Sequence, residues 1–166
     1  DPMTHKTAFT PEELYLLWKA PNTISVAIMT AQPGGLFSEM VASVKSITAA
    51  RGIYPSELMQ SILTLEQSEV DGFSERIKTE AAERGAQTPD DMLAMAIADI
   101  RSALGVLRPK ALPEEIQEYR QMLVEHAEKV AQAGKEGGFL GIGGVRVSEA
   151  EERILAEIRL AANRLH

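Results

Sequence analysis

The sequence predicts an all-α protein, a compact bundle of seven or eight helices in a single domain. Apolar residues recur at spacings of three and four along most of the chain, which is the period of an amphipathic helix. Capping residues and prolines mark repeated helix starts, while glycines and cations mark the matching ends. The chain has 166 residues, and a domain of that size buries about two thirds of its unfolded surface.

The first two helices are expected at about 10–19 and 22–31. The sequence TPEE at 10–13 supplies an N-cap, a proline at the first helical position and a capping-box glutamate. Pro21 separates the two segments, so one kinked helix is the alternative. Segment 23–31, TISVAIMTA, is apolar nearly all round, which predicts a central buried helix. Its β-branched residues make a strand the other interpretation, but no partner strand is evident.

The middle of the chain has several clear boundary signals. Arg51-Gly52 and Arg84-Gly85 place a cation and a glycine where helices are expected to end. Asp71-Gly72 is interpreted as a turn between two helices, and Thr88 with Asp91 as a capping box. The predicted helices here are 35–50, 55–68, 72–84 and 89–107.

Two further helices are expected at 113–135 and 148–165. Pro113 and Ser148 begin them, each followed by glutamates that favour the positive end of a helix dipole. Opposite charges four residues apart also predict ion pairs on solvated faces, each contributing about 0.2–0.5 kcal/mol. These pairs are Glu80–Arg84, Glu125–Lys129 and Glu149–Arg153.

Composition excludes several classes of function. Without cysteine the chain has no disulfide, thiolate metal site or cysteine nucleophile. A net charge of −7 argues against nucleic-acid and anionic-membrane partners, and no apolar run approaches the roughly 20 residues of a membrane span. No signal peptide is evident, so we expect a cytoplasmic protein. We interpret residues 1–4 as a tag remnant and start, with Met3 the native first residue, and 5–166 as the domain.

Residues 135–151, KEGGFLGIGGVRVSEAE, alternate glycines with large apolar residues. They lack the Gly-Lys-Ser/Thr end of a phosphate loop, and Arg146 replaces the third glycine of a dinucleotide fingerprint. We expect a structural loop whose apolar side chains cover one end of the bundle, with glycines supplying the turns. An anion bound beside Arg146 and Ser148 is the alternative. The loop residues are Gly137, Gly138, Phe139, Leu140, Gly141, Ile142, Gly143 and Gly144.

Histidines and acidic residues give little indication of catalysis. His126 lies on the margin of an apolar stripe, where a hydrogen-bonded histidine is more common than a metal ligand. Leu123 stands where a di-iron bundle needs a glutamate, and a serine triad has no central histidine to use. A calcium loop around Gly72 fails because Lys78 occupies the position of the bidentate glutamate. We therefore expect no cofactor.

Two segments, 26–39 and 130–152, share a form: an apolar helix, a Gly-Gly connection and an acidic helix start. This form resembles the duplicated helix–loop–helix of tellurite-resistance (TerB-type) domains. The resemblance implies an acidic, metal-binding cluster built from an Asp-Gly turn and glutamates. Gln32 or Pro33 stands where the first aspartate belongs, and Glu136 replaces the second, so we expect no strong metal site. The candidates that carry over are Glu39, Glu136, Glu151 and Glu152.

The segments FTPEE and GGFLGIGGVRVSEAE also resemble an uncharacterised family of bacterial all-helical proteins, a resemblance that implies no activity. The leading expectation is a noncatalytic binding or scaffold module with a protein partner. A homodimer through the 35–50 or 89–107 helix is one form of it. A metal-ion binding stress-response domain of the tellurite-resistance kind is the alternative. An enzyme using carboxylates is third, because no base, nucleophile and orienting group can be assembled.

Overall fold

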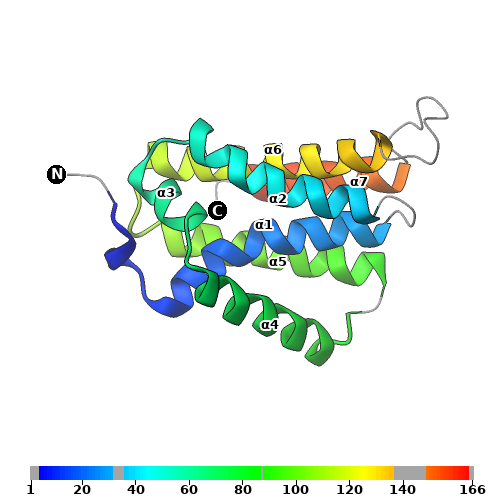
Figure 1. The fold of residues 1–166 in the computed structure, drawn as a ribbon, viewed down its shortest axis with the longest axis horizontal. Helices are drawn as coiled ribbons and strands as arrows, with labels where there is room; N and C mark the ends of the chain where they lie inside the picture. The colour runs from blue at the N-terminus through cyan, green and yellow to red at the C-terminus, as the bar shows by residue number, and fades with distance from the viewer. Residues whose placement is uncertain (1–3, 32–35, 87, 137–148, 165–166) are drawn as a thin grey trace.

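The computed structural model describes residues 4–31, 36–86, 88–136 and 149–164, without the side chains of 36–42, 134–136 and 150. Within these ranges the fold is all-α, which confirms the predicted class (Figure 1). No helix of this part is long and apolar enough to cross a membrane. After a short 3-10 helix, η1 (Lys6–Ala8), the helices are α1 (Pro11–Ala31), α2 (Leu36–Ile53), α3 (Glu57–Leu63), α4 (Gln67–Glu83), α5 (Pro89–Leu107), α6 (Pro113–Glu136) and α7 (Glu149–Asn163).

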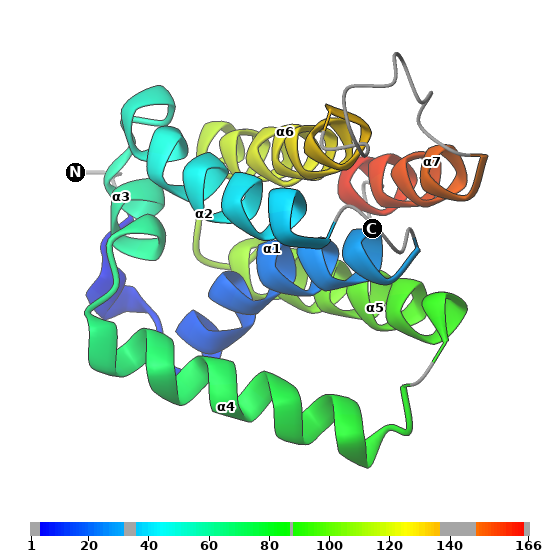
Figure 2. The same ribbon diagram turned by 45° about the vertical axis from the view of Figure 1, so that its right-hand side comes forward.

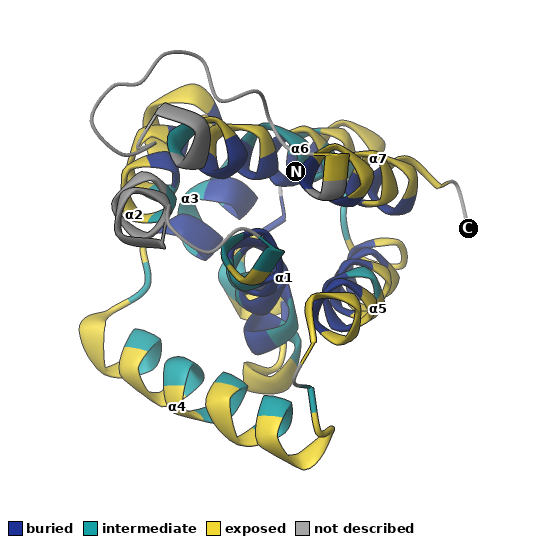
Figure 3. Cartoon of the chain, turned by 90° about the vertical axis from the view of Figure 1, so that its right-hand side faces the viewer, coloured by how far each residue is buried: buried dark blue, intermediate teal, exposed yellow. Residues whose placement is uncertain are grey.

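Helix α1 is the centre of the bundle. It packs along α5 and α6 and also contacts α2 and α7, while α2 and α7 lie against α6. Figure 3 shows the buried faces of these helices turned inward around α1. Ile24, Ala27 and Ile28 have no exposed surface. Segment 23–31 is therefore part of the central buried helix that the sequence predicts, and the strand interpretation is wrong.

Pro21 lies inside one continuous α1, so the 10–19 and 22–31 segments form a single helix. Proline has no N–H, which leaves the carbonyl of Leu17 without its usual helix partner. The hydroxyl of Tyr119 on α6 donates to that carbonyl at 2.7 Å. Tyr119 is fully buried, and burial raises its pKa, so the hydroxyl keeps its proton. A tertiary hydrogen bond thus replaces the missing helical one.

The predicted boundary at Asp71-Gly72 is wrong, because α4 begins at Gln67 and passes through both residues. The start is set by a capping box in which the Glu66 and Glu69 side chains each accept from the other's backbone. The preceding α3 is accordingly shorter than the predicted 55–68. The Asp-Gly pair resembled a turn, but the reciprocal glutamate cap upstream already satisfies the N-terminal backbone groups.

The other caps largely follow the sequence signals. Thr88 and Asp91 form the predicted capping box of α5. Gly85 has φ 63°, and its N–H and that of Ala86 bond the carbonyls of Ala82 and Ala81, which closes α4 with a Schellman turn. By contrast, α2 continues past the expected stop at residue 52 to Ile53.

Helix α4 lies at the edge of the molecule, on the far side of α1 from α6 and α7 (Figures 2 and 3). None of its residues is buried. Its contacts pass mainly to α1. This peripheral position opens one side of α1 and α2, and that side contributes to the candidate site.

Candidate functional site

A chain of buried hydrogen bonds crosses the bundle beneath α2. His126 of α6 has 2 % of its surface exposed. Its Nδ1 lies 2.9 Å from the Ser46 hydroxyl of α2, and its Nε2 lies 2.7 Å from the Ser25 hydroxyl of α1. Ser25 in turn lies 2.8 Å from the hydroxyl of Ser43. Three helices thus supply one chain, Ser43–Ser25–His126–Ser46.

The histidine in this chain is neutral at pH 7. Burial lowers the pKa of His126 to about 4, although the nearby Pro21 carbonyl favours the charged form. One nitrogen of a neutral ring donates and the other accepts. The second nitrogen faces Ser25, where a serine triad would place a carboxylate. The arrangement therefore satisfies a buried imidazole and does not form a triad.

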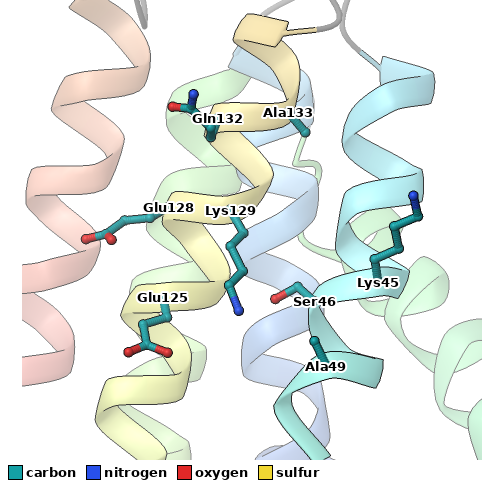
Figure 4. A pocket seen from close by; sticks show the side chains of 8 residues that line it. All are labelled: Lys45, Ser46, Ala49, Glu125, Glu128, Lys129, Gln132 and Ala133. Carbon is teal, nitrogen blue, oxygen red and sulfur yellow. The ribbon is translucent and has the colours of Figure 1, made fainter. Parts of the chain in front are cut away.

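One end of this chain of hydrogen bonds, at Ser46, reaches a groove between α2 and α6, drawn in Figure 4. The groove encloses about 580 Å³, within the range of small-molecule sites. Ser46 contributes to its lining and carries the chain to the surface. The groove is lined by Lys45, Ser46 and Ala49 from α2 and by Glu125, Glu128, Lys129, Gln132 and Ala133 from α6.

The two carboxylates of this α2–α6 groove are already engaged. Glu128 accepts from Arg159 of α7 at 3.1 Å, and Glu125 accepts from the Tyr54 hydroxyl. The hydrogen bond from Tyr54 lowers the pKa of Glu125, so it is ionised at neutral pH. In Figure 4 the Glu128 carboxylate points from α6 toward α7.

The two lysines of the same groove have no carboxylate within 4 Å among the described residues. Lys129 was expected to pair with Glu125 one turn earlier, and it does not. In Figure 4 the Lys129 ammonium and the Ser46 hydroxyl point toward one another across the groove, while Lys45 extends along α2. A cation and a hydroxyl therefore face the same open space.

The other end of the hydrogen-bond chain, at Ser25 and Ser43, reaches a second groove. This groove lies between α1, α2 and α4 and encloses about 410 Å³. Ser25 and Ser43 belong to its lining, so the buried chain connects the two grooves. Val44 has 68 % of its surface exposed here. The lining residues are Trp18, Asn22, Ser25, Val26 and Met29 from α1, Ser43 and Val44 from α2, and Ser74, Ile77 and Lys78 from α4.

Buried charges hold α4 beside this α1–α2–α4 groove. Lys19 and Asp99 are 2 % and 3 % exposed, and their Nζ and Oδ1 atoms lie 3.2 Å apart. Thr23 donates to the other oxygen of Asp99 at 2.8 Å. Lys19 also contacts Glu80 of α4. Burial opposes ionisation of Glu80, but the neighbouring cations Lys19 and Arg76 help to lower its pKa overall. This network joins α1, α5 and α4.

Aromatic contacts complete the attachment of α4. The Phe73 ring lies 5.2 Å from that of Tyr15 and 5.3 Å from that of Trp18. The guanidinium of Arg76 lies 3.9 Å above the Tyr15 ring and contacts Glu12. These contacts join one side of α4 to α1, while Ser74, Ile77 and Lys78 line the groove.

Among the described side chains, no group of three or more acidic or histidine residues could hold a metal ion. Glu151 is buried on α7, and burial raises its pKa. Glu152 is exposed and lines a separate hollow between α6 and α7. Glu39 belongs to α2 and Glu136 ends α6, but the structure does not describe their side chains. Whether the four predicted residues lie together therefore stays a prediction.

The glycine-rich connection also lies outside the described residues. This applies to the anion-site candidates Arg146 and Ser148 and to the loop residues 137–144. The structure therefore leaves both the loop prediction and the anion prediction untested.

Sequence reasoning missed most of the residues that form the two grooves. His126 was expected to be a hydrogen-bonded histidine at the margin of an apolar stripe. The structure places it in the interior with two hydroxyl partners. A signal was available, because Ser25 and Thr23 interrupt an otherwise apolar buried segment. Buried hydroxyls need partners, which points to polar groups on the facing helices.

We compared the chain with protein-family models, with curated proteins and with solved structures, and none of the three comparisons gives a match. The function must therefore be argued from the geometry of the grooves.

Proposed function

We propose that the protein is a noncatalytic binding module, and that its α1–α2–α4 groove receives the apolar face of an amphipathic helix from a partner protein. One observation carries the proposal. Two helices, α2 and α4, present Val44 and Ile77 to an open groove that also contains Trp18. Exposed apolar surface of this kind marks an interaction site.

The form of the groove favours a helix as the occupant. Its sides are helices, and an amphipathic helix lays its apolar residues into such a groove at spacings of three, four and seven. The small side chains of Ser43 and Ser74 leave room for larger ones of a partner. Such packing needs interaxial distances of about 8–10 Å.

Charge at the rim adds a preference for acidic residues beside the apolar face of the partner. Lys78 lines the groove and lies 3.1 Å from Glu75, with both side chains strongly exposed. Exposed pairs of this kind contribute little stability. Lys78 can therefore exchange Glu75 for a carboxylate of the bound helix at little cost.

The proposal is tested with amphipathic helical peptides selected from a display library against the whole chain. Trp18 is the single tryptophan and lines the groove, so its fluorescence reports occupancy. We expect bound peptides to change the Trp18 emission, and Val44→Glu to weaken binding by about tenfold or more, because it places a charge against apolar side chains.

Leu160→Glu is the matched control. Leu160 of α7 is 61 % exposed, comparable with Val44, but lies outside this groove. We expect this variant to bind like the wild type. Selection of no peptide, or equal loss of binding in both variants, contradicts the proposal. Light scattering separates a partner from a second copy of the chain, since a homodimer doubles the mass in the absence of peptide.

A further inference from the structure

We propose that the α2–α6 groove is a separate binding site for a small organic oxyanion, a carboxylate or phosphate group held between Lys129 and Ser46. The inference concerns a different groove from the one in the proposed function and does not depend on it. It starts from the facing ammonium and hydroxyl groups in Figure 4.

The arrangement of the charges in the groove, rather than their sum, favours an anion. Lys129 is exposed and, in the part of the chain that is described, has no carboxylate within 4 Å. The neighbouring Glu128 and Glu125 are engaged by Arg159 and Tyr54. An incoming oxyanion therefore meets a cation that has no ion pair among the described residues, while the two carboxylates of the lining already accept hydrogen bonds from Tyr54 and Arg159.

Lys45 supplies a second cation on the α2 side. Its side chain extends along α2 in Figure 4, but a lysine has a flexible four-carbon stem and can turn toward a ligand. The enclosed volume of about 580 Å³ accommodates a small molecule that carries the anionic group.

The hydroxyl of Ser46 gives the site a distinctive property, because an anion can only accept hydrogen bonds. Ser46 must then donate its proton to the ligand, and its oxygen accepts from Nδ1–H of His126, which lies 2.9 Å away. The ring stays neutral, so Nε2 loses its proton and accepts from Ser25 at 2.7 Å. A bound oxyanion thus fixes His126 as the Nδ1–H tautomer.

Without the anion, the opposite tautomer makes more hydrogen bonds. Ser25 lies 3.1 Å from the Pro21 carbonyl and can donate to it only if Nε2–H of His126 donates to Ser25. Nδ1 then accepts from Ser46. Binding at the groove therefore reverses the direction of donation along the chain.

The test uses the whole chain labelled with ¹⁵N on histidine. Succinate, citrate and inorganic phosphate are the probes, each compared with chloride at equal ionic strength. In each tautomer the protonated ring nitrogen and the unprotonated one have different ¹⁵N chemical shifts. A change of tautomer therefore interchanges the shifts of Nδ1 and Nε2. We expect saturable binding of at least one probe and, with it, movement of His126 from the Nε2–H toward the Nδ1–H pattern. The comparison between the organic acids and phosphate shows which source of the oxyanion is preferred.

Variants assign the site. Lys129→Gln should weaken binding by about tenfold or more, as expected for loss of a charged hydrogen bond. Ser46→Ala should remove the tautomer change. Lys78→Gln is the control, since Lys78 is an exposed lysine of the other groove, and it should bind like the wild type. Binding that is absent for all probes, unchanged in Lys129→Gln, or without effect on the His126 ring overturns the proposal.

Discussion

Helices α4 and α5 are consecutive in the chain and similar in length, yet they have opposite roles. Ten residues of α5 are buried, and none of α4. Both begin with a capping box, so the quality of the cap does not decide burial. The difference lies in the inward face. That of α5 is apolar except for the buried Asp99, whereas that of α4 is interrupted by Arg76 and Glu80 and has no buried residue. The apolar helix builds the core, and the ion-paired helix borders a groove.

The largest expected effect lies in α5. Leu104 is almost fully buried, and Leu104→Ala should cost about 4 kcal/mol of unfolding free energy through lost burial and a residual cavity. Urea denaturation measures this cost. The matched change in α4, Ile77→Ala, should cost about 1 kcal/mol because Ile77 is only partly buried. Equal costs would remove the distinction between the two helices.

Acid should act on the bundle through His126. Its folded pKa of about 4 lies below the unfolded value of 6.5, so the unfolded state takes up the proton first. Above about pH 6.5 the histidine is neutral in both the folded and the unfolded state, so it does not make stability depend on pH. Stability falls by about 3 kcal/mol as the pH decreases through this window to about 4.

A matched variant isolates this pH effect from other titrating groups. His126→Gln keeps a polar side chain but does not titrate, so the difference in stability between it and the wild type should decrease toward pH 4. Unfolding curves at several pH values measure the difference. A difference independent of pH would show that His126 is protonated equally in both states.

The next effect concerns the junction between the two helices. Asp99→Ala leaves the buried ammonium of Lys19 with Glu80 alone. We expect a loss of about 2 kcal/mol, below the 3–5 kcal/mol of a pair deprived of every partner. Lys19→Met in the same chain should restore most of the loss, since it removes the uncompensated charge. A double-mutant cycle of Asp99→Ala and Lys19→Met measures the interaction energy between the two residues. Additive losses of stability would contradict their coupling.

The smallest effect should be confined to α4. Phe73→Ala removes the ring between Tyr15 and Trp18 and should cost about 1 kcal/mol or less. Hydrogen exchange should become faster along α4 and stay unchanged in α5, because the edge helix opens separately. Faster exchange in both helices would mean that α4 is part of the cooperative core.

The same contrast explains how much of the fold could be predicted. The predicted limits of 89–107 agree with α5, since its apolar period and its Thr88 cap indicate the same helix. For α4 the local signals conflicted, and Asp71-Gly72 resembled a turn although Glu66 had already begun the helix. Prediction succeeded where packing and local chemistry agreed.

The candidate site depended on contacts that local spacing cannot reveal. Ser25 and His126 are 101 residues apart, and His126 and Ser46 are 80 apart. The expected Glu80–Arg84 pair does not form, because Glu80 contacts Lys19 and Arg76 instead. Spacing shows which groups are neighbours on one helix, but the partner of a buried polar group is fixed by which helices pack together.

The proline in α1 has a consequence for how the protein is made. The Leu17 carbonyl, which Pro21 leaves without a helical partner, accepts a hydrogen bond from the Tyr119 hydroxyl, 102 residues later in the chain. During synthesis, α1 leaves the ribosome long before Tyr119 does, so the nascent helix has a gap at its midpoint and no core partner to cover it. The central helix of the finished bundle therefore becomes fully hydrogen-bonded only after most of the chain has been translated.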